Sequence, residues 1–210
     1  MSSPYRPNVL LDYWFGTTPP TPDELPARMR LWFGDEHAPE LRPQNDEALR
    51  LRFGAWARAA ARGELDDWAS SPRRRLALIL LLDQLPRNLY RGTPQAFSQD
   101  AAALSQTLSG MQLGADAALA PVERMFFYMP LEHSESPDVQ EESLAAFQRL
   151  QSEADAALRP MLQGVYEYAR VHHDIIARFG RFPHRNHILG RVDTPEEAEW
   201  LRKAGPSFGQ

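Results

Sequence analysis

The sequence predicts an all-α protein, a compact bundle of antiparallel helix pairs. Apolar residues recur at spacings of three and four in several segments, which is the period of an amphipathic helix. Leu76–Leu82 is a run of seven consecutive apolar residues, built mostly from the strong helix formers Leu and Ala. No segment alternates apolar and polar residues, and no Asn-Gly or Asp-Gly turn marks a hairpin. Proline and glycine divide the chain into roughly eight to ten helices, whose short connections favour antiparallel neighbours.

The first third of the chain predicts three helices. Thr21-Pro22-Asp23-Glu24 has the pattern of a capping box with proline at the first helical position. Asp35–Pro43 contains two prolines and is expected to be a loop. The predicted helices are Pro7–Phe15, a segment from the capping box to about Phe33, and Asp46–Arg62.

The apolar run Leu76–Leu82 is expected to form the central helix. Ser71 and Pro72 supply a cap and a first-turn proline. A helix that is apolar on all sides is a buried helix. Pro86 is expected to disrupt it and to leave carbonyls without intrahelical partners. The polar groups that follow must therefore find partners or face a pocket.

The second half predicts five more helices. They are Gln99–Ser109, Pro121–Tyr128, Pro137–Leu158, Met161–Phe179 and a closing helix that ends near Gly205. A second capping box, Thr194-Pro195-Glu196-Glu197, opens the closing helix. His172 lies on the apolar stripe of its helix, so it is expected to point inward. It is either a buried histidine bonded to a neighbour or a residue that lines the same pocket as Asp83.

The length and composition of the chain restrict which kinds of protein it can be. A chain of 210 residues fits a single domain spanning residues 1–210. It contains no cysteine, which excludes disulfides and thiolate chemistry, and its net charge of −5 argues against nucleic acid or an anionic membrane as partner. The longest apolar run is too short to span a bilayer, and Met1–Asn8 does not resemble a signal peptide. We expect a cytoplasmic protein, and the sequence leaves its oligomeric state open.

Three clusters of polar residues adjoin apolar elements. They are Asp83, Gln84, Arg87, Asn88 and Arg91; Glu132, His133, Ser134, Glu135 and Gln140; and Arg181, His184, Arg185, Asn186, His187 and Arg191. Charges that are partly desolvated persist only when they are paired, and the acids of the first two clusters need arginines of the first and third. We therefore expect Asp83, Arg87, Glu132, His133, Glu135, Arg181 and His184 to converge on one site.

The residue types in these clusters favour acid–base chemistry. The candidate general acids and bases are Glu132, His133, Glu135 and His184. The remaining candidates are predicted ligand contacts: Asp83, Gln84, Arg87, Asn88, Arg91, Ser134, Gln140, His172, Arg181, Arg185 and Asn186. Ser134 lies beside His133, but no Gly-x-Ser-x-Gly elbow is present, which disfavours a serine hydrolase. His133, His184 and His187 could ligate a metal with Glu132 or Glu135, but without a metal-binding spacing we assign no metal site. The sequence leaves the cofactor unknown.

Three long motifs resemble a known family. They are LLDQLPRNLYRGTPQAFSQD at Leu81–Asp100, PLEHSESPDVQ at Pro130–Gln140 and FGRFPHRNHILGRVDTPEE at Phe179–Glu197, joined by Trp-Phe-Gly at Trp14–Gly16. They resemble the bacterial and fungal domain of unknown function 924, of the tetratricopeptide-like helical superfamily, over nearly the whole chain. The resemblance implies a compact right-handed bundle of antiparallel helix pairs, and it implies no particular reaction.

Three functions remain open from the sequence. The first is a small-molecule site, able to take an anionic ligand or to act catalytically, where the clusters meet. The second is a helical module that presents a groove to a peptide. In the third, the clusters are a structural network, in which Arg178, Arg181, Arg185 and Arg191 pair with internal carboxylates such as Asp83, Glu132 and Glu135 rather than bind an anion.

Overall fold

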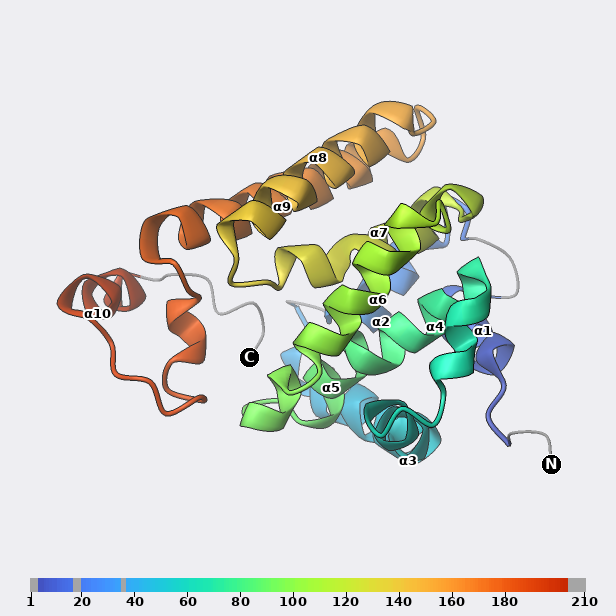
Figure 1. Ribbon diagram of the computed structural model, residues 1–210, viewed down its shortest axis with the longest axis horizontal. Coiled ribbons are helices and arrows are strands. Elements are labelled where there is room, and N and C mark those ends of the chain that lie inside the picture. The colour runs from blue at the N-terminus through green and yellow to red at the C-terminus, as the bar shows by residue number, and fades with distance from the viewer. Residues whose placement is uncertain (1–3, 17–19, 35–36, 204–210) are drawn as a thin grey trace.

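The structure, a computed structural model, describes residues 4–16, 20–34 and 37–203, and all regular elements among them are helical. This confirms the all-α class (Figure 1). The α-helices are α1 (Pro7–Phe15), α2 (Leu25–Phe33), α3 (Arg42–Ala61), α4 (Pro72–Leu82), α5 (Gln84–Leu89), α6 (Asp100–Gln112), α7 (Pro121–Glu132), α8 (Pro137–Glu153), α9 (Arg159–Phe179) and α10 (Pro195–Arg202). Residues 35–36 of the predicted loop, and Gly205, where the closing helix was expected to end, lie outside the described residues.

Helix α4 is the centre of the core. Residues Leu76 to Leu81 are completely buried and Leu82 is 4% exposed, as predicted for a helix that is apolar on all sides. It packs against α1, α3, α6 and α7, which surround it in Figure 1. One continuous cluster of buried apolar residues runs from α1 to α9 through α4, so most of the helices share a single core.

The second half of the bundle is built from helical hairpins. Helices α6 and α7 pack together, and α8 lies side by side with α9 along one edge of the molecule (Figure 1). A small separate cluster of Ile175, Ile176 and Phe182 packs against Phe179 and Trp200, and it attaches the last segments to the end of α9.

Two helices continue through residues that were expected to end them. Helix α6 passes Gly110, where a Cβ atom would lie 2.5 Å from the ring of Phe127 and 2.8 Å from Arg75, so glycine is needed there for close packing. Helix α7 passes Pro130 and ends at Glu132. A proline removes a single donor, and the helical pattern resumes after it, with the amide of His133 bonded to the carbonyl of Met129 at 3.2 Å. Glu132 therefore lies on the last turn of a buried helix rather than in a loop.

Other boundaries shift by a turn. Helix α3 starts at Arg42, four residues early, with Pro43 in its first turn, and α8 ends at Glu153 rather than near Leu158. Thr21 makes its expected contact with Glu24, its amide donating to Oε2 at 2.8 Å, but the regular helix begins at Leu25. Pro26 has no N–H, so it cannot donate the hydrogen bond that would continue the turn at Thr21–Glu24 into α2 as one regular helix.

The second capping box is confirmed. The Thr194 hydroxyl accepts a hydrogen bond from the amide of Glu197 at 3.2 Å, and the Glu197 carboxylate accepts one from the amide of Thr194 at 2.7 Å. Both residues stand at the start of α10, as the pattern predicts. Of the helices in the described part of the chain, none combines the length and the apolar character that a membrane span requires.

Candidate functional site

A cavity of about 710 Å³, here called the main cavity, lies beyond the polar end of α4. Side chains of α2, α3, α5, α7 and α9 and of the turn Pro183–Arg185 line it. Many of the residues singled out in the sequence are among them: Gln84, Arg87, Asn88, Arg91, Glu132, His133, His172, His184 and Arg185. The structure therefore brings residues of all three sequence clusters to one place.

Asp83 and His133 form a buried pair beside this cavity. Asp83 follows the last residue of α4 and is completely buried, whereas His133 follows the last residue of α7. Nδ1 of His133 lies 2.7 Å from Oδ1 of Asp83. The amide of Gln84 donates to Oδ2 of Asp83 at 2.6 Å, and Nη1 of Arg87 lies 3.2 Å from Oδ1.

The surroundings set the charge states of this pair. Burial raises the pKa of Asp83, but the charges of His133 and Arg87 and the hydrogen bonds to the carboxylate outweigh burial, so that pKa lies well below its usual value. Burial and the charge of Arg87 lower the pKa of His133, against the opposing effect of Asp83. Asp83 is therefore ionised and His133 neutral at neutral pH. Because an ionised carboxylate only accepts, Nδ1 of His133 carries the proton, which leaves Nε2 as an acceptor.

Nε2 of His133 has no hydrogen-bond partner among the described residues. The ring is 13% exposed and lines the main cavity. The contact with Asp83 thus fixes the tautomer, and the opposite nitrogen belongs to a ring that lines the main cavity. That is the arrangement in which a histidine acts as a general base.

Glu132 is a second titratable group at the same cavity. It is 3% exposed, and its buried Oε2 has no hydrogen-bond partner in the part of the chain that the structure describes. Burial, reinforced by the negative charge of Asp83 and opposed by Arg87, raises the pKa of Glu132 to about 8. Glu132 is therefore a neutral carboxylic acid at neutral pH. Glu132 has a raised pKa and its neighbour His133 a lowered one, so Glu132 is the candidate acid and His133 the candidate base.

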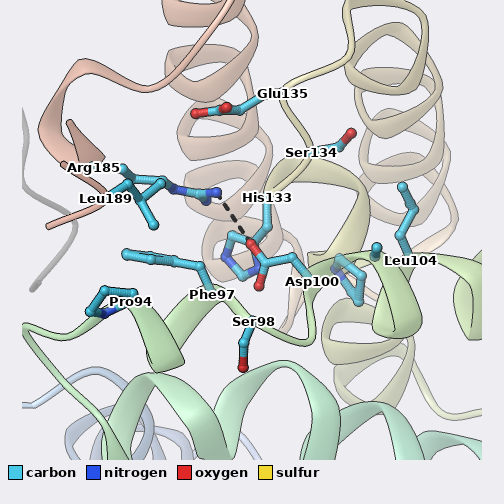
Figure 2. A pocket seen from close by; sticks show the side chains of 12 residues that line it. Pro94, Phe97, Ser98, Asp100, Leu104, His133, Ser134, Glu135, Arg185 and Leu189 are labelled. Atoms are coloured by element: carbon cyan, nitrogen blue, oxygen red, sulfur yellow. Dashed lines mark hydrogen bonds and ion pairs between the residues drawn. The ribbon is translucent and has the colours of Figure 1, made fainter. Parts of the chain in front are cut away.

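Two carboxylates that were not among the predicted site residues hold the arginines. Asp100 accepts two hydrogen bonds from Arg87, at 3.0 and 3.1 Å, and one from Arg185 at 3.2 Å, which Figure 2 shows as a dashed line. Asp46 of α3 accepts from Asn88 at 3.0 Å and from Arg91 at 2.9 Å. Asp100 is the final residue of the motif Leu81–Asp100, which is the signal that could have identified it.

A smaller cavity of about 410 Å³ is also lined by His133 (Figure 2). His133, Arg185 and Phe97 line both cavities and so separate them. Ser134 also lines the smaller cavity, but its hydroxyl points away from the ring of His133 (Figure 2) and accepts a hydrogen bond from the amide of Ser136. The pair is therefore not arranged as a serine nucleophile and its base.

Two other histidines of the main cavity, His172 and His184, are also held neutral. His172 is 3% exposed, its Nδ1 lies 3.0 Å from the carbonyl of Tyr168, and its ring contacts that of His133 edge-on at 6.1 Å between centroids. Burial and the charge of His133 hold the pKa of His172 well below its usual value. Burial, with Arg185 and Arg191, lowers the pKa of His184 to about 3. His172 is thus both buried and part of the cavity wall, which combines the two expectations for it.

Several predicted residues lie beside the cavities in supporting positions. Glu135 lines the smaller cavity and is clamped by Arg191 at 2.7 and 3.0 Å. Gln140 is completely buried and donates to the carbonyls of Glu132 and Ser134 at 2.8 and 2.7 Å, which fixes the end of α7. Asn186 is completely buried and donates to Asp193.

Arg181 departs from the expected convergence. Its guanidinium pairs with both carboxylate oxygens of Glu197, at 2.6 and 2.7 Å, and lines neither cavity. Glu197 at the start of α10 is its partner, so Arg181 joins α10 to the segment after α9. Among residues 4–16, 20–34 and 37–203, no three His, Asp or Glu side chains are grouped to hold a metal ion.

The comparisons with known proteins bear on the family. The sequence model of a family described as "Bacterial protein of unknown function (DUF924)" matches residues 10–205. The chain belongs to this family. It also resembles a solved structure, described as the "Structure of Protein of Unknown Function ATU0120 from Agrobacterium tumefaciens", with 33% identity over 94% of this chain and 97% of that chain and a TM-score of 0.77. No curated protein matches the chain.

The DUF924 match includes every residue that lines either cavity, from Met29 to Leu189. Neither description names an activity, so the geometry of the site carries the functional argument for this DUF924 chain.

Proposed function

We propose that this DUF924 protein binds a small molecule in the main cavity and that His133, Glu132 and Asp83 move protons on it. One observation carries the proposal. The Nδ1 atom of His133 is held by a buried carboxylate, while Nε2 has no partner among the described residues and belongs to the cavity wall. A purely structural histidine has no need of a second nitrogen without a partner on a ring that lines a cavity.

The proposed chemistry is general acid–base catalysis. Nε2 of His133 takes a proton from the ligand, and the imidazolium that forms is stabilised by the ionised Asp83. The carboxyl group of Glu132 donates a proton to a ligand oxygen that gains negative charge. The ligand thus loses one proton and gains one, as in an isomerisation, and transfer from the imidazolium to the carboxylate of Glu132 restores the starting state.

The other residues have supporting roles in this proposal. Arg87, Arg185 and Asp100 form a rigid charged frame behind His133. Gln140 holds the backbone that carries Glu132. We also propose that residues 1–210 form a single domain related to tetratricopeptide-like proteins, and the shared core and the α6–α7 and α8–α9 hairpins support this.

A thermal-shift screen tests the proposal. The wild-type protein is scanned against small carboxylated and phosphorylated metabolites, with and without divalent metals, and we expect at least one compound to raise its melting temperature. His133→Asn keeps a donor near the position of Nδ1, so the contact with Asp83 survives, and it removes Nε2. We expect this variant to melt at about the wild-type temperature and to lose the ligand-induced shift.

His133→Gln is the matched variant, because its amide reaches the position of Nε2 and abandons Asp83. We expect it to lose stability, since Asp83 then lacks one of its buried partners. A ligand-induced shift that is unchanged in His133→Asn would refute the proposed role of His133. A screen in which no compound stabilises the wild-type protein would refute the binding function.

A second function is favoured by the outer charges. The pairs Arg181–Glu197 and Arg191–Glu135 join separate segments, and in each pair the guanidinium donates to both carboxylate oxygens. For these residues we propose a structural role, as in a helical scaffold or interaction module. Loss of stability in Glu197→Gln, with ligand-induced shifts unchanged, is the expected result.

A further inference from the structure

We infer that the main cavity takes an uncharged α-hydroxycarbonyl compound, a molecule with a hydroxyl group on the carbon next to a carbonyl group and with an apolar substituent. This inference names the substrate class of the proposed function and rests on it. Three properties of the cavity carry the argument: its balanced charges, a donor and an acceptor without partners on consecutive residues, and apolar side chains beside them.

The charged side chains next to the candidate acid and base balance one another. Nη1 of Arg87 lies 3.2 Å from Oδ1 of Asp83 and 3.0 Å from Oδ1 of Asp100. Nη1 of Arg185 lies 3.2 Å from Oδ2 of the same Asp100. Two positive charges thus meet two negative charges, and the acid and the base are themselves uncharged. A ligand with a net charge would have no counter-charge here among the described residues, so an uncharged ligand is favoured.

The two other arginines that line the cavity do not change this balance. Arg91 is paired with a carboxylate of α3 at 2.9 Å. Arg42 donates to the carbonyl of Phe33 at 3.1 Å, and the ring of Phe33 stacks on that of Phe126. Phe126 precedes Glu132 by six residues on α7, which is about 9 Å along the helix. The charge of Arg42 therefore belongs to another part of the cavity.

Glu132 and His133 offer a donor and an acceptor to one ligand. They are consecutive residues, whose Cα atoms are about 3.8 Å apart, and both line the main cavity. Both also lie near Asp83, which is 2.7 Å from Nδ1 of His133 and whose charge contributes to the raised pKa of Glu132. The carboxyl group of Glu132 has a proton to donate and no partner at Oε2 among the described residues, whereas Nε2 of His133 only accepts. A fitting ligand must accept one hydrogen bond and donate another from neighbouring atoms.

An α-hydroxycarbonyl compound carries these two groups on adjacent carbons. Its carbonyl oxygen accepts from Glu132, and its hydroxyl group donates to Nε2 of His133, which brings the hydroxyl-bearing carbon within reach of the same nitrogen. Nε2 takes a proton from this carbon while Glu132 protonates the carbonyl oxygen. The C–H bond breaks, an O–H bond forms and the double bond moves from C=O to C=C, so that the ligand becomes a neutral enediol. The imidazolium then gives its proton to the carboxylate of Glu132.

Apolar side chains adjoin these polar groups. Met129 lies three residues before Glu132 on α7, and both line the cavity. Glu132 is a neighbour of Tyr168, because its charge contributes, after burial, to raising the pKa of Tyr168 to about 12. Val165 lies three residues before Tyr168 on α9 and also lines the cavity. An apolar substituent on the carbonyl carbon would pack against such side chains, and the flexible thioether of methionine adapts to its shape.

Isothermal titration calorimetry with 2-hydroxy-1-phenylethanone and three analogues tests the inference. Acetophenone lacks the hydroxyl group, 1-phenylethane-1,2-diol lacks the carbonyl group, and mandelate carries a negative charge. We expect the wild-type protein to bind the hydroxyketone about tenfold more tightly than either of the first two, because each loses one hydrogen bond, and to bind mandelate more weakly still. Affinity for any of the three that equals the affinity for the hydroxyketone overturns the inference.

Deuterium exchange tests the proton transfer. In D₂O, formation of the enediol replaces the hydrogens on the hydroxyl-bearing carbon by deuterium, and proton NMR follows the loss of their signal. We expect the wild-type protein to accelerate this exchange, and His133→Asn and Glu132→Gln to leave it at the rate measured without protein. Glu132→Gln keeps a donor and should still bind the hydroxyketone. Exchange at the wild-type rate in either variant, or no acceleration by the wild-type protein, overturns the inference.

Two leucine variants locate the ligand. Gly164 lies on α9, lines the main cavity, and a Cβ atom there would meet nothing within 4 Å. Ala101 is exposed on α6 and lines the smaller cavity but not the main one. Both variants should fold, because leucine is a strong helix former.

We expect Gly164→Leu to weaken binding of 2-hydroxy-1-phenylethanone by about tenfold or more, because its side chain fills the main cavity, and Ala101→Leu to bind like the wild-type protein. The opposite result, or wild-type affinity in both variants, overturns the inference. If the hydroxyketone does not bind, but another compound of the thermal-shift screen gives a shift that His133→Asn abolishes, the substrate class is wrong and the proposed function stands. If no compound stabilises the protein, both fail.

Discussion

Replacing Glu132 with glutamine should change how the stability of the protein depends on pH. The pKa of Glu132 is raised from 4.5 to about 8, so between these values the folded protein holds a proton that the unfolded chain releases. Stability therefore falls as pH rises through this range, by about 1.4 kcal/mol per pH unit. The amide that Glu132→Gln introduces has no proton to lose in this range, and the slope disappears.

The window from pH 6.5 to pH 8 isolates the effect. The pKa values of His133, His172 and His184 are lowered from 6.5, so these residues add stability as pH rises only below that value. Asp83, with its pKa lowered from 3.8, acts only in acid. His173, whose pKa Glu141 raises, contributes a falling slope that is common to wild type and variant.

Between pH 6.5 and pH 8, the free energy of unfolding of the wild-type protein should fall by about 2 kcal/mol relative to that of Glu132→Gln. Urea unfolding followed by circular dichroism at several pH values measures the difference. Glu142→Gln, at an exposed position of α8, is the control and should follow the wild-type curve. Parallel curves for wild type and Glu132→Gln would show that Glu132 is already ionised at neutral pH, and the acid–base assignment would then fail.

Two further predictions concern the fold. Leu80→Ala in α4 should destabilise the protein by about 2–5 kcal/mol in urea unfolding, because Leu80 is completely buried and its removal leaves a cavity, and a cost below about 1 kcal/mol would contradict the central place of α4. Thr194→Ala removes the cap of α10 and should cost about 0.5–2 kcal/mol, whereas Thr194→Ser should retain most of that stability. Equal loss in both variants would show that the hydroxyl is not what matters.

The sequence predicted the features that depend on local pattern. The burial of Leu76–Leu82 and the box at Thr194 follow from side-chain type and spacing, which act within one helix. The passage of α6 through Gly110 and of α7 through Pro130 depends instead on packing between helices. Local rules treat these residues as breaks, because the ring of Phe127 that occupies the space beside Gly110 is distant in sequence.

The candidate site was predicted only in part, because it too depends on contacts between segments that are distant in sequence. The three polar clusters were visible as dense groups of charged residues, but the partners of their arginines were not. Arg87 pairs with Asp100 as well as Asp83, and Arg91 with Asp46, since pairing is decided by which carboxylates the fold brings near. The apolar side chains that line the main cavity escaped prediction altogether, because a pattern that marks Met161 as apolar does not indicate whether its neighbours fill the space.

The tautomer of His133 tests the central claim most directly. In protein labelled with ¹⁵N, long-range ¹H–¹⁵N correlation spectra distinguish the two ring nitrogens, and His133→Asn identifies the signals by their loss. We predict at neutral pH a neutral ring with the proton on Nδ1, and an Nε2 resonance that shifts when a stabilising compound is added. A proton on Nε2, a cationic ring, or an Nε2 resonance that no stabilising compound moves would contradict the account.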